Sequence, residues 1–302
     1  MIPNNLIHLS SEVSAALAAN KPVVALESTV IAHGLPRPQN YETARRLEQI
    51  VREGNATPAT IAILDGQLTA GLDLDETRLI AESDDIKKAS VRDLPIAVAQ
   101  NWNAATTVAS TSWIAHRAGI KVFATGGIGG MHRGSLPDVS GDLPALAITP
   151  IVVVCSGAKI VLDLPATREW LETYGITVVG FQCDEMPAFY SRRSGLPIDV
   201  RADTPEDVAR IFHAQQGLGI ERALLVTVPV PEEFEIPAAA LEQTLTAALK
   251  EADRQGIAGR ELTPFLLSTM AHHSHGATLN ANIALLENNA RVAATIAGAL
   301  VD

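Results

Sequence analysis

Cysteine is scarce in this sequence. Cys155 and Cys183 are its only two cysteines in 302 residues, far too few for a disulfide scaffold, so a reducing cytoplasm is the natural compartment. The opening residues, MIPNNLIHLS, lack the basic and apolar regions of a signal peptide. The longest apolar run, IVVVC, lies between Pro150 and Ser156 and is much shorter than a membrane span. We therefore expect a soluble intracellular protein with no membrane partner.

Positive charge and aromatic side chains are also in short supply. The formal net charge is −11 and aromatic residues make up 4% of the chain. A general nucleic-acid binder presents a basic surface, so this charge argues against nucleic acid as a partner. Any phosphate-bearing ligand must then be held by a local pocket of cations and backbone N–H groups.

The residues that are abundant indicate an α/β fold. Hydrophobic residues make up 47% of the chain and charged residues 19%, which is typical of a globular protein. Short apolar runs alternate with amphipathic stretches, so we expect buried parallel strands covered by helices. We predict one large α/β domain over residues 1–302 with a helical C-terminal cap. The expected strands are 22–27, 59–64, 121–125, 151–155, 176–181 and 222–228; the expected helices are 40–55 (with Asn40 as its N-cap), 165–175, 205–219, 237–256 and 279–300.

The densest glycine run, ATGGIGGMHRG, spans residues 124–134 and follows an expected strand. A dinucleotide-binding fingerprint needs glycines at its first, third and sixth places, but counting from Gly127 puts His132 sixth. A P-loop needs Gly-Lys followed by Ser or Thr, and this run ends in RGS instead. Two interpretations stay open: a ligand loop at a strand end, or glycines that serve only tight turns and close packing. The polar side chains in and after the run are His132, Arg133, Asp138, Ser140 and Asp142.

Two charged residues end or follow buried apolar runs. Glu27 closes VVALE, where partial desolvation raises the pKa of a carboxyl and suits a general acid, although a capping or ion-pairing role is the alternative. Lys159 lies between IVVVCSGA and IVLDL, where its ammonium must find partners or lose its proton. A deprotonated lysine attacks carbonyl groups to form a Schiff base. The alternative is a surface lysine at a strand–helix junction.

Two further clusters are ambiguous. Lys88 and Arg92 form a basic patch in KKASVRDLP that either binds a phosphate or is a solvated charge run. The stretch HHSH, residues 272–275, lacks the spacing of a two-histidine metal site on a helix, and we interpret it as a polar helix end. The residues alone thus favour an enzyme acting on a phosphate or sugar phosphate.

Six blocks of the sequence closely resemble one known family. They run in order from about Pro22 to near Ala290, with spacing close to that of the family, and together they resemble the pseudouridine-5′-phosphate glycosidases. This resemblance implies an α/β/α sandwich with a mostly parallel central sheet. The blocks are ESTVIAHGLPRPQN, ATGGIGGMHRG, VVCSGAKIVLDL, GFQCDEMPAFYSRRSG, TPFLL and NIALLENNA.

The resemblance implies roles for particular residues. Glu27 corresponds to the proton donor of the family and Lys159 to its nucleophile. Asp138 corresponds to the metal ligand, with Asp142 as the alternative direct ligand. The loop between Gly134 and Asp138, Ser135–Pro137, is slightly shorter than in the family. The expected substrate-contacting residues are Lys88, Val108, His132, Ser140, Gly141, Asp142 and Asn282.

The resemblance also implies the reaction. The family reversibly cleaves the C–C glycosidic bond of pseudouridine 5′-phosphate to uracil and ribose 5-phosphate, uses a divalent ion, typically Mn²⁺ with Mg²⁺ as an alternative, and forms homotrimers. A Schiff base on Lys159 would carry the ribose. Three alternatives stay open: a lysine-dependent aldolase acting on sugar phosphates, a nucleotide-cofactor oxidoreductase, and a non-catalytic nucleotide-binding protein.

Overall fold

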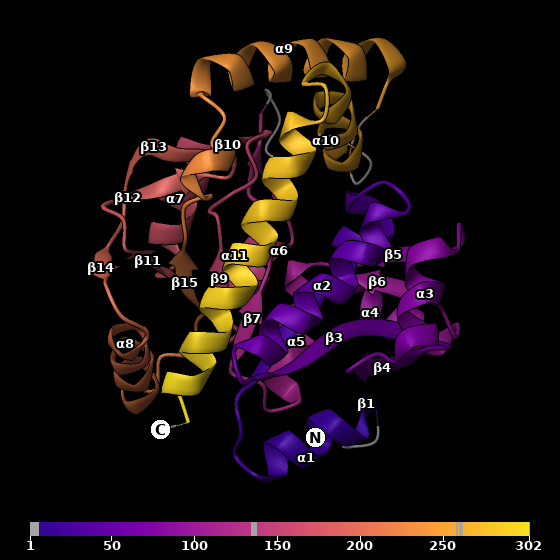
Figure 1. Cartoon of the computed structure of the whole chain (residues 1–302), viewed down its shortest axis with the longest axis vertical. Coiled ribbons are helices and arrows are strands. Elements are labelled where there is room, and N and C mark those ends of the chain that lie inside the picture. Colours follow the sequence, from indigo (N-terminus) through magenta and orange to yellow (C-terminus); the bar gives the residue numbers. More distant parts are fainter. Residues whose placement is uncertain (1–5, 134–137, 258, 260–261, 302) are drawn as a thin grey trace.

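The computed structural model describes residues 6–133, 138–257, 259 and 262–301 (Figure 1). The loop Ser135–Pro137, expected to be short, lies outside these residues. Within the described part, no helix combines the length and the apolar character needed to cross a membrane.

A central sheet organises the fold. It has eleven strands in the described part of the chain, and its main path runs β1-β4-β3-β2-β7-β9-β15-β11-β14. Off this path, β6 pairs with β3, and β5 pairs with β6. Pairing is parallel except where β3 meets β4 and β6. The strands of this sheet are β1 (Ile7–Leu9), β2 (Val23–Glu27), β3 (Thr57–Leu64), β4 (Gln67–Ala70), β5 (Lys87–Ala89), β6 (Ala104–Thr106), β7 (Val122–Ala124), β9 (Val152–Cys155), β11 (Thr177–Phe181), β14 (Val200–Ala202) and β15 (Leu224–Thr227).

Helices flank the sheet, and two small two-stranded sheets accompany it. The small sheets pair β8 (Met131–His132) with β10 (Leu162–Asp163) and β12 (Glu185–Ala188) with β13 (Ser191–Pro197). The α-helices are α1 (Ser11–Ala18), α2 (Gln39–Glu53), α3 (Leu74–Glu82), α4 (Leu94–Ala99), α5 (Val108–Arg117), α6 (Asp142–Leu146), α7 (Leu164–Thr173), α8 (Pro205–Gly217), α9 (Ala238–Gln255), α10 (Leu262–His273) and α11 (Ala277–Ala299). Shorter turns are η1 (Val30–Gly34, a π-helix), η2 (Val91–Asp93) and η3 (Glu232–Phe234).

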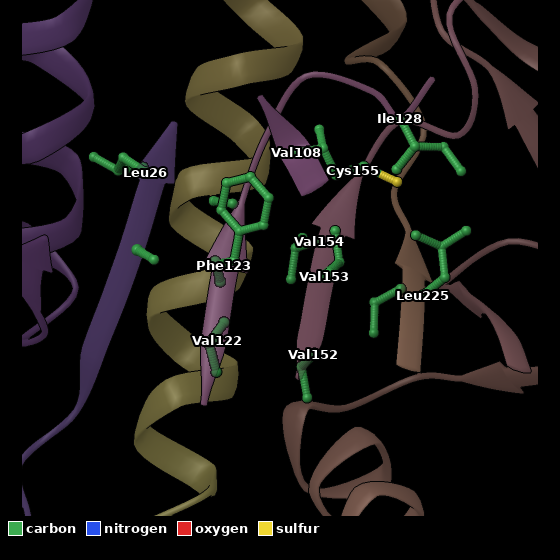
Figure 2. Packing of buried hydrophobic residues seen from close by; sticks show 14 of the residues in the cluster. Leu26, Val108, Val122, Phe123, Ile128, Val152, Val153, Val154, Cys155 and Leu225 are labelled. Atoms are coloured by element: carbon green, nitrogen blue, oxygen red, sulfur yellow. The ribbon is translucent and has the colours of Figure 1, made fainter. Parts of the chain in front are cut away.

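The predicted fold class is confirmed. All six expected strands form, as β2, β3, β7, β9, β11 and β15, and all five expected helices form, as α2, α7, α8, α9 and α11. Every residue of β2, β9 and β15 is buried, because helices cover both faces of the sheet. Helices α5 and α11 both contact β2 and β7, and α11 crosses the sheet in Figure 1. Figure 2 shows the apolar side chains of β7, β9 and β15 packed beside one another.

One expectation about helix capping was wrong. Asn40 is not the N-cap of α2; that position is Pro38, and Asn40 is the second residue of the helix. Its buried side-chain Nδ2 donates to the carbonyl oxygens of Ile31 at 2.9 Å and Ala81 at 2.8 Å. A buried amide satisfied by two distant carbonyls stabilises the tertiary structure, and here it fixes η1 against α2 and α3.

The strand order brings three chain segments to one edge of the sheet. Strands β2, β7 and β9 are adjacent and parallel, so their carboxyl ends lie together. From α11, the Asn289 amide donates to the Thr125 carbonyl oxygen at 2.8 Å and to Ser156 Oγ at 3.1 Å. These bonds hold the segments that follow β7 and β9 under α11. In open α/β sheets this edge is where ligands bind.

Candidate active site

Two adjoining chambers lie at the carboxyl ends of these strands. The larger has a volume of about 380 Å³ and the smaller about 50 Å³. The residues that line both chambers mark their boundary; they are Glu27, Thr29, Lys88, Lys159 and Thr263.

All ten site residues expected from the sequence line one or both chambers. Asn282 lies in the smaller chamber, and Glu27, Lys88 and Lys159 lie at the boundary. The remaining six line the larger chamber: Val108, His132, Asp138, Ser140, Gly141 and Asp142. The HHSH stretch lies at the end of α10, which terminates at His273, as expected.

The glycine run packs closely against other groups and also lines both chambers. A Cβ atom on Gly127 would lie 2.8 Å from the Phe189 ring, and one on Gly129 would lie 2.2 Å from Ser140 Oγ. Real side chains do not approach so closely, so these glycines allow other groups to pack against the backbone. Gly127 also lines the smaller chamber and Gly129 the larger one. The run is therefore a tightly packed wall of the site.

The backbone around Lys159 is fixed by the same glycine run. Ile128 N–H donates to the Gly157 carbonyl oxygen at 3.0 Å, and Lys159 N–H donates to the Ile128 carbonyl oxygen at 3.1 Å. This pair of bonds is a short parallel bridge beyond the ends of β7 and β9. The half-buried Lys159 side chain is thus presented from an ordered backbone at the boundary between the chambers.

Glu27 is buried at that boundary, with 7% of its surface exposed. Its Oε1 accepts a hydrogen bond from Thr125 Oγ1. Burial raises the pKa of the Glu27 carboxyl above its ordinary value, against the opposing effects of the nearby Lys159 charge and the Thr125 hydrogen bond. The raised pKa expected for a strand-end carboxyl is thus present, and Glu27 keeps its proton to a higher pH than an exposed glutamate.

Cys155 is a buried cysteine near Lys159. Burial raises the pKa of its thiol to about 12, so the thiol stays protonated at neutral pH. Because the thiolate is the nucleophilic form of cysteine, Cys155 is a core residue and not a nucleophile.

The larger chamber combines cations with a helix N-terminus. Lys88 on β5 and Arg92 on η2 line it, together with Ser140, Gly141 and the start of α5. Val108, the first residue of α5, lines the chamber although it is only 1% exposed. Backbone N–H groups at a helix N-terminus and nearby cations together favour an anion such as a phosphate.

The two aspartates of this chamber have different environments. Asp142 is 6% exposed, and its two carboxylate oxygens accept hydrogen bonds from Ala109 N–H at 2.9 Å and Gly129 N–H at 2.8 Å. Asp138 is exposed, and its carboxylate has no partner among the described residues. Asp142 therefore positions backbone, whereas Asp138 can ligate a metal directly.

Known proteins resemble this chain along nearly its whole length. A family profile described as indigoidine synthase A like protein matches residues 12–299. A pseudouridine-5′-phosphate glycosidase of Caldanaerobacter subterraneus subsp. tengcongensis is 51% identical over 296 residues, covering 97% of this chain and 96% of that protein. A protein of the same name from Hahella chejuensis is 48% identical, covering 97% of this chain and 98% of the other. The chain belongs to the pseudouridine-5′-phosphate glycosidase family.

Solved structures agree with this assignment, and the resemblance inferred from the sequence is confirmed. An indigoidine synthase A-like protein of Thermotoga maritima superposes with a TM-score of 0.91 at 40% identity, covering 100% of this chain and 99% of that one. The prealnumycin C-glycosynthase AlnA, in complex with ribulose 5-phosphate, gives a TM-score of 0.91 at 39% identity, covering 99% of this chain and 98% of that one. Like the other members of its family, this protein is an enzyme.

Sequence reasoning missed several residues of this glycosidase-family site. They include His33, Thr125 and Phe189, which line the smaller chamber, and Asn289, which holds the backbone beside it. Thr125 directly follows β7, and Glu27 is the last residue of the neighbouring parallel strand β2. Because the carboxyl ends of adjacent parallel strands lie together, the position of Thr125 in the sequence could have indicated its contact with Glu27. Phe189 has a positive φ of 61° and packs against Gly127, a contact that no sequence pattern indicates. His33 and Asn289 lie within blocks of the family resemblance, but only the fold shows what they contact.

The role of Asp142 can be tested by its effect on stability. We expect Asp142→Asn to lower the free energy of unfolding by about 1.5–3 kcal/mol, because an amide nitrogen replaces one charged acceptor opposite a buried N–H. The matched control Asp138→Asn alters an exposed carboxylate nearby and should change stability by less than about 0.5 kcal/mol. Urea denaturation measures both; equal stabilities of the two variants would contradict the positioning role of Asp142.

The raised pKa of Glu27 predicts a gain in stability on its neutralisation. A raised folded-state pKa contributes stability below about pH 4.5, the ordinary glutamate value, and that stability is lost as the pH rises through the folded-state pKa. Glu27→Gln should therefore unfold at a higher temperature than the wild type at neutral pH, with the difference shrinking toward pH 4. The control Glu169→Gln removes an exposed carboxylate of α7 and should follow the wild-type pH dependence. Thermal unfolding between pH 4 and 8 measures both variants. The quantity compared is the unfolding temperature of Glu27→Gln minus that of the wild type. A smaller difference at neutral pH than at pH 4 would contradict the prediction.

Proposed function

We propose that this enzyme reversibly cleaves the C–C glycosidic bond of pseudouridine 5′-phosphate to uracil and ribose 5-phosphate, through a Schiff base on Lys159. The observation that carries this proposal is the placement of a buried carboxyl, Glu27, and a lysine, Lys159, at the boundary between two chambers of unlike chemistry. A bond between two unlike halves of a substrate would be cleaved at such a boundary.

Each chamber suits one product. The larger chamber, with Lys88, Arg92 and the first turn of α5, has the cations and backbone donors that a sugar phosphate needs. The smaller chamber combines the apolar surfaces of Phe189 and Leu286 with the amide of Asn282. Asn282 is 6% exposed and can both donate to and accept from the edge of a base. We assign ribose 5-phosphate to the larger chamber and uracil to the smaller.

The chemical steps use Glu27 and Lys159 in turn. Glu27 donates a proton to the ring oxygen as the bond between C1′ and that oxygen breaks, and the Lys159 amine forms a bond to C1′. The Glu27 carboxylate then takes a proton from the attached Lys159 nitrogen and delivers it to uracil C5 as the bond from C1′ to C5 breaks. The electron pair of that bond stays with C5, and the nitrogen lone pair forms the iminium. Water adds to this iminium and releases ribose 5-phosphate, which regenerates the lysine. The hydrogen bond from Thr125 orients the Glu27 carboxyl throughout.

The donor set of the larger chamber fits a hydrated divalent ion. No group of three or more His, Cys, Asp or Glu side chains that could hold a metal occurs among the described residues. One carboxylate with several waters is nevertheless a normal arrangement for Mn²⁺ or Mg²⁺. We propose Asp138 as the residue that holds Mn²⁺, which would order water and polarise oxygen atoms of the substrate. The Asp142 oxygens already accept backbone N–H groups, so we assign Asp142 no direct ligation.

The relatives support this function over its alternatives. Proteins named pseudouridine-5′-phosphate glycosidase match almost the whole chain at 46–51% identity. AlnA, with the same fold, is complexed with ribulose 5-phosphate, a five-carbon sugar phosphate. An aldolase acting on sugar phosphates would not need the smaller chamber, and a non-catalytic binding protein would not need Lys159 at the boundary. The homotrimer and the cytoplasmic location stay predictions.

The Schiff base predicts a covalent adduct that requires Lys159. Wild-type enzyme with Mn²⁺ should release uracil from pseudouridine 5′-phosphate, and borohydride with ribose 5-phosphate should add one reduced sugar phosphate to Lys159. Lys159→Ala should lose both turnover and the adduct, because it lacks the only nucleophile proposed for C1′. The control Lys121→Ala removes an exposed lysine at the start of β7 and should keep both. Uracil release by folded Lys159→Ala would overturn the lysine mechanism.

The metal proposal predicts a selective loss on changing Asp138. Chelation of divalent ions should abolish turnover of the wild type, and added Mn²⁺ should restore it. Asp138→Asn should raise the Mn²⁺ concentration needed for half-maximal activity by about 10-fold or more, because it removes the charged ligand. Titration of activity with Mn²⁺ measures this, and an unchanged requirement would place the metal on other groups.

A further inference from the structure

His33 faces the smaller chamber from an unusual piece of backbone. It lies in η1, a single turn of π-helix that begins three residues after Glu27. Such turns are rare and occur frequently at functional sites. The turn is held at Ile31, whose carbonyl oxygen accepts from the buried Asn40 amide, and by the bond from Ala32 N–H to the Ser28 carbonyl oxygen at 3.0 Å. His33 is therefore fixed relative to the Glu27 carboxyl.

One nitrogen of the His33 ring is buried without a partner. Nε2 is inaccessible to solvent and has no hydrogen-bond partner among the described residues, although His33 lines the smaller chamber. Buried polar atoms are almost always satisfied, and an exception in a binding chamber points to a partner that arrives with the ligand. Two other side-chain atoms share this condition, Ser112 Oγ and Arg168 Nη1, but neither residue lines a chamber of the site.

The surroundings of His33 favour a neutral ring. Burial and the charge of Lys88 lower the pKa of His33 below its ordinary value. A neutral imidazole carries one N–H and one lone pair. With the ring proton on Nδ1, Nε2 presents the lone pair, and its missing partner is a donor.

We propose that His33 determines base specificity: its Nε2 accepts a hydrogen bond from a ring N–H group of the uracil base in the smaller chamber. This inference rests on the proposed function, which assigns uracil to that chamber. A base joined to ribose through C5 has two ring N–H groups, N1–H and N3–H, whereas a base joined through N1 has only N3–H. An acceptor in this chamber can therefore recognise an N–H that conventional pyrimidine nucleotides lack.

Two substitutions of His33 test Nε2 separately from Nδ1. The shorter side chain of His33→Asn keeps a polar group near the place of Nδ1, but none of its atoms reaches the place of Nε2. His33→Gln carries its amide oxygen to the place of Nε2. We expect His33→Asn to lower kcat/KM for pseudouridine 5′-phosphate by about 10- to 100-fold, mainly through KM, and His33→Gln to restore much of the loss.

Trapping of ribose 5-phosphate on Lys159 with borohydride is the control for a structural role. That adduct contains no base, so His33→Asn should form it as the wild type does. Methylated substrates identify the donor. Wild-type enzyme should discriminate against either N1-methyl- or N3-methylpseudouridine 5′-phosphate by about 10-fold or more, and His33→Asn should lose that discrimination.

Three results would overturn the proposal. The first is a kcat/KM of His33→Asn equal to that of the wild type. The second is a loss of borohydride trapping in His33→Asn as large as its loss of turnover. The third is equal use by the wild type of pseudouridine 5′-phosphate and its N1-methyl and N3-methyl forms. The last comparison needs no variant, so it decides the question even if a variant fails to fold. Absence of turnover by the wild type itself would instead refute the proposed function, and this inference with it.

Discussion

The Asp142 carboxylate is the contact on which the shape of the site most depends. Its two oxygens join the glycine run, through Gly129 N–H, to the first turn of α5, through Ala109 N–H. These segments belong to different strand–helix connections, and both line the larger chamber. Because the carboxylate is buried and charged, loss of either bond leaves an unsatisfied group in a low-dielectric environment, which is more costly than loss of a surface contact.

A second layer of contacts fixes the backbone of Lys159. Asn289 reaches from α11 to the ends of β7 and β9, and Ile128 forms the short bridge that holds the backbone of Lys159. The glycines between these contacts leave no space for side chains, so this part of the chamber wall is backbone. Such a wall has few rotatable bonds, which suits the proposed reaction, in which a C–C bond would lie at a fixed place between Glu27 and Lys159.

The sequence predicts those parts of the fold that short-range patterns determine. The central strands were found because burial on both faces makes them continuous apolar runs, as in β9. The short strands β5, with sequence KKA, and β6, with sequence AAT, were not found, because neither lies in a run of large apolar residues as β7 does. Asn40 was misassigned because asparagine is a favoured N-cap, whereas its two partners are distant carbonyls that no local pattern indicates. The positions of the site residues came from the family blocks; the division into two chambers and the backbone-holding role of Asp142 depend on long-range packing.

The burial of Val108 links the hydrophobic core to the shape of the larger chamber. Val108 lines that chamber at the first turn of α5, yet it is only 1% exposed and packs within the core (Figure 2). A larger side chain at this position would have to displace its buried neighbours or shift the first turn of α5, whereas an apolar residue of similar volume would disturb both least. The packing volume at position 108 therefore sets limits on the geometry of the chamber.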